Sequence, residues 1–235
     1  MTIGLDVLDE QTQALLATVS ALSPEDLAGD SMLPEWSRGH VLAHIAGNAE
    51  GLGRRARFVI DGVPRAMYES LDSRSADVEW RASRSRDEHR EALAATHADL
   101  RRDLAGIPAG RDDDEIELRP GILLRVDQLP LLRLQEVCIH HADLGLATYT
   151  WRDWPSAMVE RVLPRVVATF RTRDAFPAAW IEIDGERVPM GDGATGESGV
   201  AGDALPMLAW LTGRSDGEGL RSIGGDGVPE APPWL

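Results

Sequence analysis

The stretch from Leu134 to Asp143, which reads LQEVCIHHAD, is the feature that most constrains how this chain folds. It lies in an apolar run that begins near Val126 and repeats with the period of a helix. Residues four apart share one face of a helix, so Glu136 and His140 project together. A charged glutamate on a mostly buried helix needs a partner. The stretch therefore predicts a helix that carries a polar site on its buried side.

A second stretch, HVLAHIAGN from His40 to Asn48, offers the matching half of that site. It carries His44 in an apolar setting on another expected helix. Glu-x-x-x-His on one helix and a histidine on a second can give three ligands to one divalent metal. That is the protein contribution expected at an open, catalytic zinc site. The same ligand types also suit iron or nickel, so the residues predict a metal site without fixing the metal.

The histidines leave alternatives open. Glu136 and His140 can also form a simple surface pair on a helix. His40 lies four residues before His44 on the same face and competes with it as the ligand of this helix. His141 is adjacent to His140 but points about 100° away around the helix axis.

Two further residues near Glu136 are candidates for this site. Asp143 lies one turn beyond His140, where it either orients that histidine or ends the helix without a role. Cys138 is a soft ligand type, but it faces away from Glu136. A buried, inert thiol is the stronger interpretation of Cys138.

Composition narrows the class of protein. The chain has 235 residues, of which 43% are hydrophobic and 27% charged, as in soluble globular proteins of one or two domains. The net charge of -15 disfavours nucleic acid as a partner, because binding it requires clustered positive charge. No apolar run reaches the ~20 residues that span a bilayer, and the N-terminus lacks a signal-peptide pattern. We therefore expect a cytoplasmic protein with no membrane partner, and the single cysteine excludes an internal disulfide framework.

Apolar periodicity and capping signals predict four long helices in the first part of the chain. The predicted ranges are about 5–22, 37–60, 85–105 and the apolar run that ends near Gly145. Residues 61–82 are expected to be irregular, and residues 115–125 read as a small hairpin. Helices at this spacing indicate an antiparallel bundle, whose core can hold metal ligands from facing helices.

The pattern changes after about residue 150. The expected elements are a helix at about 155–171 interrupted by Pro164, strands at 179–184 and 187–190, a flexible glycine-rich loop at 191–199, a strand at Val200, a helix at about 203–212 and a last strand at 222–223. This order predicts a small α+β domain. We therefore divide the chain into residues 1–150 and residues 151–235.

The motifs around His44 and Glu136 resemble the mycothiol-dependent maleylpyruvate isomerase family. The similarity includes the sequence GRSDG at 213–217 and the proline-rich C-terminal end, so it covers essentially the whole chain. The resemblance implies an α+β protein. Its N-terminal part would be a DinB-like four-helix bundle that binds metal and thiol. Its C-terminal part would be a smaller α/β (SCP2-like) domain that contributes to the active site.

The resemblance also assigns roles to residues. By resemblance, the zinc ligands are His44, Glu136 and His140. Arg214 is implied to take part in catalysis, and Arg74 takes the position of a substrate-binding arginine. Spacing alone would leave both arginines as solvated surface residues, whereas arginine can hold a carboxylate with two parallel hydrogen bonds. The family has one more glycine than this chain between the arginine and the Ser-Asp-Gly that follows.

The activity implied by the resemblance is a zinc- and mycothiol-dependent conversion of maleylpyruvate into fumarylpyruvate, a step of aromatic catabolism in the gentisate pathway. Zinc would ionise the thiol, and the thiolate would add to the cis double bond. The resulting single bond would rotate, and elimination would release the trans isomer. The partners would be a dicarboxylic keto acid and a low-molecular-weight thiol. Two alternatives remain, a mycothiol S-transferase for another electrophile and a non-enzymatic metal-binding regulatory module.

Overall fold

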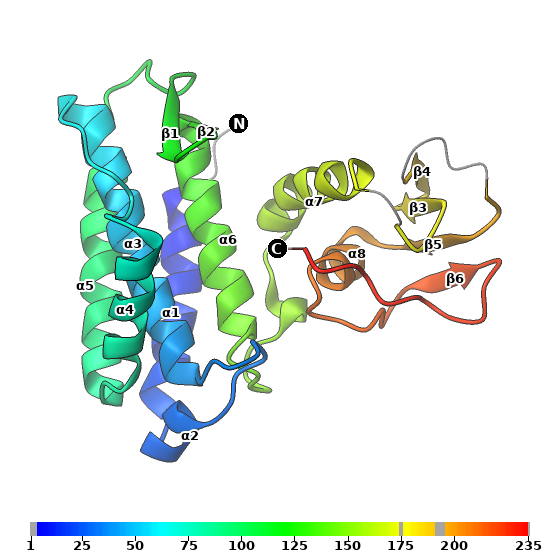
Figure 1. The fold of residues 1–235 in the computed structure, drawn as a ribbon, viewed down its shortest axis with the longest axis horizontal. Coiled ribbons are helices and arrows are strands. Elements are labelled where there is room, and N and C mark those ends of the chain that lie inside the picture. The colour runs from blue at the N-terminus through cyan, green and yellow to red at the C-terminus, as the bar shows by residue number, and fades with distance from the viewer. Residues whose placement is uncertain (1–3, 174–175, 191–195, 235) are drawn as a thin grey trace. The chain divides into compact units, whose positions relative to one another are not determined.

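The structure is a computed structural model that describes residues 4–173, 176–190 and 196–234 (Figure 1). The chain divides into two compact units, residues 1–148 and residues 149–235. The first is a bundle of helices and the second combines helices with a small sheet, so the predicted α+β fold class is confirmed. None of the helices in these described ranges is long and apolar enough to cross a membrane.

Four long helices build the first unit, as predicted. They are α1 (Leu5–Ala21), α3 (Arg38–Asp61), α5 (Arg86–Ala105) and α6 (Leu129–Ala142). The shorter elements are α2 (Pro24–Ala28), α4 (Leu71–Ala82), the hairpin strands β1 (Glu115–Arg119) and β2 (Ile122–Arg125), and the 3-10 helix η1 (Val126–Gln128). Helix α3 packs against α4, α5 and α6, which makes it the central element of the unit (Figure 1).

Local sequence signals explain where these helices begin. The serines that precede α2, α3, α4 and α5 each accept a hydrogen bond from the third backbone N–H of the helix. In each case the side chain three residues on bonds back to the serine N–H, which completes a capping box. Helix α3 ends at Gly62, whose φ of 73° is the left-handed conformation that glycine adopts without steric cost.

The expectation that residues 61–82 are irregular is wrong for their second half, which forms α4. Only Val78 of this helix is buried, so the apolar stripe that reveals a helix in a sequence is missing. Ser70 precedes the helix and caps it by accepting a hydrogen bond from the N–H of Ser73. The third helical position, where glutamate is the usual sign of a capping box, is held by Ser73, which is a weaker signal.

Aliphatic side chains from all four long helices fill the core of the bundle. The largest fully buried ones include Leu8, Leu15, Leu42, Ile45, Leu52, Leu93, Leu100, Leu129 and Leu134. Burying each of them stabilises the fold by roughly 1.5–3 kcal/mol relative to exposure. This packing fixes α3 against α6, the two helices that carry the expected metal ligands.

The second unit contains the elements that the sequence predicts. They are α7 (Ser156–Arg171), β3 (Trp180–Ile183), β4 (Glu186–Pro189), β5 (Gly199–Gly202), α8 (Ala204–Leu211) and β6 (Arg221–Ile223). A short 3-10 helix that the sequence did not predict, η2 (Trp151–Asp153), precedes them. The strand order is β4-β3-β5-β6, with β3 and β5 parallel and both outer pairs antiparallel. Most of the predicted glycine-rich loop, residues 191–195, lies outside the described residues.

Candidate metal centre

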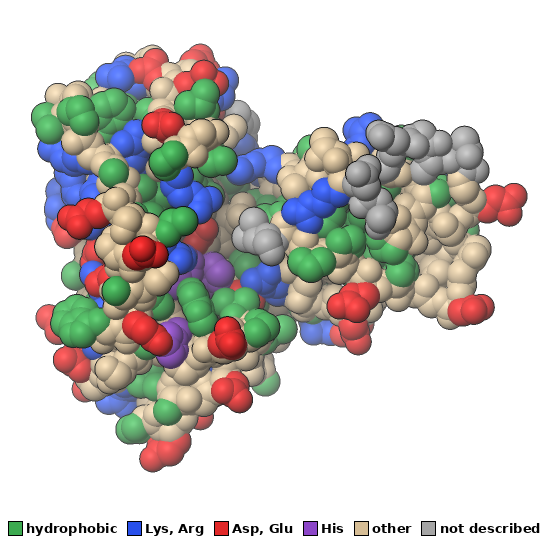
Figure 2. Space-filling model, in the orientation of Figure 1, with side chains coloured by type: hydrophobic (Ala, Val, Ile, Leu, Met, Phe, Trp, Pro, Cys, Tyr) green, Lys and Arg blue, Asp and Glu red, His purple; other side chains and the backbone are tan. Residues whose placement is uncertain are grey.

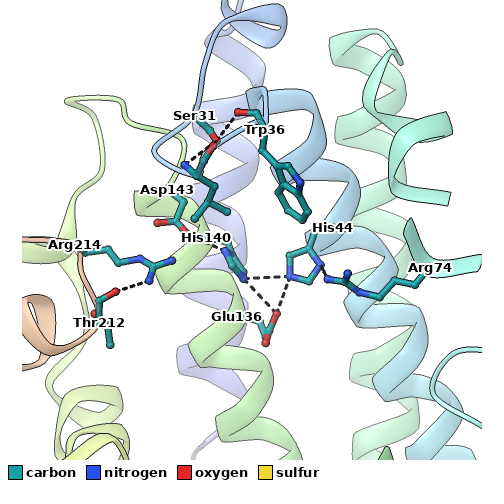
Figure 3. A network of polar contacts seen from close by, with 10 residues as sticks. Ser31, Trp36, His44, Arg74, Glu136, His140, Asp143, Thr212 and Arg214 are labelled. Carbon is teal, nitrogen blue, oxygen red and sulfur yellow. Dashed lines mark hydrogen bonds and ion pairs between the residues drawn. The ribbon is translucent and has the colours of Figure 1, made fainter. Parts of the chain in front are cut away.

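Three side chains converge between α3 and α6 (Figure 3). His44 Nε2 lies 3.1 Å from Oε2 of Glu136 and 3.1 Å from Nε2 of His140. The His140 Nε2 is 3.6 Å from the same Glu136 oxygen. One ligand atom from each residue lies within 4.8 Å of the others, and within the described part of the chain no second group of this kind occurs. The three residues that the family resemblance implies as metal ligands therefore lie together at one point.

His40 has hydrogen-bond partners outside the candidate metal centre. Its backbone N–H and Nδ1 belong to the capping box with Ser37 at the start of α3. Its Nε2 lies 2.8 Å from Oε2 of Glu79 on α4. His40 is therefore a capping residue that joins α3 to α4, and it is absent from the group that contains His44.

The alternatives on α6 also have other partners. His141 is buried, and its Nε2 lies 2.8 Å from the hydroxyl of Thr18 on α1. Cys138 is fully buried, with its sulfur 3.7 Å from Oε1 of Gln11, also on α1. Both side chains are therefore directed toward α1 rather than toward Glu136, as helical geometry predicts.

Asp143 holds the His140 ring. The His140 Nδ1–H donates to Oδ2 of Asp143 at 2.8 Å, and the aspartate side chain is buried at the C-terminal end of α6. A hydrogen bond at Nδ1 fixes the orientation of the ring and leaves Nε2 to face His44 and Glu136 (Figure 3). Of the two roles that the sequence left open for Asp143, the structure favours orienting the histidine.

Arg74 makes the corresponding contact with the other histidine. Its Nη2 donates to Nδ1 of His44 at 3.0 Å. Because Nδ1 of His44 accepts this bond, the neutral ring carries its proton on Nε2, which donates to Glu136. A neutral histidine that binds a metal through Nε2 carries its proton on Nδ1 instead. Metal binding through Nε2 would therefore break the Arg74–His44 contact.

Burial and hydrogen bonding shift the pKa values of the three residues in different directions. Burial is the main cause that lowers the pKa of His44. Burial alone would raise the pKa of Glu136, but hydrogen bonds from His140 and His44 together hold that pKa well below its usual range. Burial would lower the pKa of His140, yet its bonds to Asp143 and Glu136 raise it to about 9. Without a metal, the group at neutral pH thus combines a carboxylate, an imidazolium and a neutral imidazole.

A cavity of about 400 Å³ lies beside His44. Arginines line it, but three of them are already engaged: Arg81 bonds to both carboxylate oxygens of Glu50, Arg65 bonds to both carboxylate oxygens of Asp61, and Arg54 donates to the carbonyl of Met67. Arg74 also lines the cavity. In the space-filling view, histidine side chains reach the surface on this face of the bundle (Figure 2).

Tyr68 is a cavity residue that the sequence did not single out for a role. The Arg74 guanidinium lies 5.7 Å from the centre of its ring. Burial, together with the negative charge of Glu136, raises the pKa of the phenol. Tyr68 therefore stays neutral at physiological pH and can donate a hydrogen bond to a ligand in the cavity.

Arg214 belongs to the second unit. It follows Gly213, whose φ of 76° ends the turn after α8, as the predicted helix C-cap requires. Its Nη1 donates to the carbonyl oxygen of Thr212 at 2.5 Å (Figure 3). The expected role of Arg214 in catalysis remains a prediction.

The fold and the site together define a helical-bundle protein with a two-histidine, one-carboxylate group beside a cavity. The family model described as the mycothiol maleylpyruvate isomerase N-terminal domain matches residues 8–145, and the chain belongs to this family. This confirms the family that the sequence motifs predict. No curated protein matches the chain.

Two solved structures share the fold. The crystal structure of the mycothiol-dependent maleylpyruvate isomerase aligns with a TM-score of 0.88 at 23% sequence identity. The crystal structure of a histidine-to-alanine mutant of such an isomerase aligns with a TM-score of 0.87 at 22% identity. Each comparison covers 98% of this chain and 95% of the other chain. At this level of identity the likeness establishes the fold.

Proposed function

We propose that this protein is a cytoplasmic, zinc- and mycothiol-dependent isomerase that converts maleylpyruvate into fumarylpyruvate. The observation that carries the proposal is the convergence of His44, Glu136 and His140 beside a cavity. The family to which the chain belongs and the names of the two solved structures support this activity over others.

The three side chains fit a divalent metal. Two imidazole nitrogens and one carboxylate oxygen are the ligand types of catalytic zinc sites, and three protein ligands leave a coordination position for a small molecule. Asp143 supports the fit, because a metal-binding histidine commonly donates its other N–H to a carboxylate. A metal held there would supply the positive charge that keeps a bound thiol ionised at neutral pH.

The residues of the cavity would then bind and orient the keto acid. Arg74 would exchange its contact with His44 for a substrate carboxylate, which accepts two parallel hydrogen bonds from a guanidinium. The Tyr68 hydroxyl would donate to the carbonyl oxygen, where negative charge accumulates when a nucleophile adds to the conjugated double bond. A dianionic substrate needs a second cation, and we assign that role to Arg214 of the second unit.

The attacking thiol has to come from outside the chain. Cys138 is the single cysteine of the sequence, and it is fully buried. A thiolate suits a reversible addition, because it is both a good nucleophile and a good leaving group. A low-molecular-weight thiol is therefore the partner that the site requires.

The test is turnover of maleylpyruvate by the zinc-loaded protein, with mycothiol added in amounts far below those of the substrate. We expect isomerisation that needs both zinc and thiol and leaves the thiol unconsumed, and we expect Cys138→Ala to behave like the wild type. Full activity without thiol would contradict the proposal. Stoichiometric consumption of thiol would favour an S-transferase, and zinc binding without turnover would favour a regulatory module.

A further inference from the structure

Arg133 is a charged residue in the core of the bundle. It lies on α6, three residues before Glu136, and its side chain is completely buried. Its Nη1 donates to the carbonyl oxygen of Ile45 at 2.8 Å and to Oδ1 of Asn48 at 2.9 Å. Among the described residues, its Nε and Nη2 have no hydrogen-bond partner. A buried guanidinium with only part of its donors satisfied destabilises a fold, so packing alone does not account for it.

The two acceptors of Arg133 lie next to the histidine of α3. Ile45 follows His44 directly, and Asn48 lies four residues beyond it, on the same face of the helix. Glu136 lies one turn beyond Arg133 on α6. The two hydrogen bonds thus join the turn of α3 that carries His44 to the turn of α6 that precedes Glu136.

This link matters because the candidate ligands come from two helices. His140 and Glu136 share α6, so their spacing is fixed by that helix alone, whereas the distance from His44 to Glu136 depends on how α3 sits against α6. Aliphatic contacts between helices permit small shifts, while two hydrogen bonds from one planar guanidinium fix a single register. Ligand-to-metal distances tolerate only about 0.2 Å of error.

Arg133 and Glu136 also carry opposite charges, which attract each other. Burial lowers the pKa of Arg133 to about 10, and the negative charge of Glu136 acts in the opposite direction. The guanidinium is therefore still protonated at neutral pH. It supplies a positive charge to Glu136 from inside the core.

We propose that Arg133 is a positioning residue of the metal centre, holding α3 against α6 through Ile45 and Asn48 so that His44 meets Glu136 at metal-ligand distance. The inference rests on the proposed metal binding and does not depend on the substrate. A purely structural role for Arg133 makes a different prediction, namely that its removal changes the stability of the metal-free fold and leaves metal binding as it is.

The experiment makes two measurements on the wild type and on each variant. Competition with a chromophoric chelator gives the zinc affinity, and the visible spectrum of the Co²⁺-loaded protein reports the coordination geometry. Arg133→Met and Asn48→Leu should each weaken zinc binding about 10–100-fold, the range found when residues that orient metal ligands are replaced. Both should alter the Co²⁺ spectrum. Arg133→Lys should recover part of the affinity, because an ammonium keeps the charge and loses the planar fork.

Arg55→Met is the matched control. Arg55 is also a buried arginine, it donates to the carbonyl of Arg65, and it lies about three turns beyond His44 on α3. Thermal unfolding without metal should show that each variant folds, and Arg55→Met should keep wild-type zinc affinity and spectrum. If Arg133→Met does not fold, Asn48→Leu and Arg133→Lys carry the comparison.

Wild-type affinity and an unchanged spectrum in folded Arg133 and Asn48 variants would overturn the inference while leaving the proposed function intact. A wild-type protein that binds neither zinc nor Co²⁺ would overturn the metal site itself. An equal loss of affinity in Arg55→Met would show that any buried arginine has the same effect, which also contradicts a specific role for Arg133.

Discussion

The Nδ1–H of His140 donates to the buried carboxylate of Asp143 across 2.8 Å, one turn further along the same chain. Together with Glu136, this carboxylate raises the pKa of His140 to about 9, against the effect of burial. The contact thus has two consequences. It directs Nε2 toward the other candidate ligands, and it leaves a proton on His140 that a metal must displace.

Zinc affinity should therefore depend on pH. Below pH 9, zinc binding releases the His140 proton. The dissociation constant for zinc should therefore fall about tenfold for each unit by which the pH is raised, and it should level off near pH 9. In Asp143→Asn the pKa of His140 should drop, and the pH at which the affinity levels off should move down with it. Chelator competition between pH 6 and 9.5 measures both curves. Superimposable curves for the two proteins would contradict the role of Asp143.

The stability of the metal-free protein should show the opposite trend. The pKa of His140 is raised in the folded state, to about 9 from an ordinary value of 6.5. Its contribution to stability is therefore fully present below pH 6.5 and is lost as the pH rises through 9. We expect the free energy of unfolding to fall by on the order of 2 kcal/mol across this window. Urea titrations should show the fall in the wild type, and His140→Gln should be nearly flat over the same range.

Replacing Arg74 should affect metal binding and turnover in opposite directions. Arg74 donates to Nδ1 of His44, and this contact has to break before Nε2 of the neutral ring can bind a metal. Arg74→Met removes both that competition and a nearby positive charge, so zinc affinity should rise several-fold. Turnover should fall, because the substrate loses a cation. Arg54→Met is the control, since Arg54 lines the same cavity but bonds to the carbonyl of Met67. Weaker zinc binding in Arg74→Met would contradict this account.

The two histidines of α3 should differ sharply when they are replaced. His44→Ala should abolish zinc binding while the bundle still folds. His40→Ala should bind zinc normally and lose about 1 kcal/mol of stability, because it breaks the capping box with Ser37 and the contact with Glu79. Zinc content and thermal unfolding of the two variants measure these effects. Loss of zinc from His40→Ala with retention in His44→Ala would reverse the assignment.

His40 and His44 also show how much of the metal centre can be predicted from the sequence. Glu136 and His140 could be matched from the sequence because their spacing is local to one helix. Spacing alone could not separate His40 from His44, because residues one turn apart share a face. What separates them is the partner of His40 on α4, a helix that the sequence did not predict because it buries so little apolar surface.

The long helices and the hairpin, by contrast, followed from apolar periodicity and from serine caps. The contacts of Arg133, in contrast, could not be predicted from the sequence. An arginine inside the apolar run of α6 was visible in the sequence, but its partners Ile45 and Asn48 depend on which face of α3 packs against it. Only the packed structure supplies that information.

Arg214 provides the last prediction, and its support is the family resemblance together with the charge of the substrate. A dianionic keto acid needs two cations, and we propose that Arg74, which lines the cavity of the bundle, supplies one of them. Arg214→Ala should lower kcat/KM for maleylpyruvate by about 10–100-fold, the value of one charged hydrogen bond, without loss of zinc. Arg214→Lys should recover only part of the activity, because an ammonium lacks the planar fork that binds a carboxylate at two points. Arg221→Ala, at an exposed position of β6, is the control and should leave the kinetics unchanged. Equal kinetics for the Arg214 and Arg221 variants would leave Arg214 as a surface residue and restrict substrate binding to the bundle.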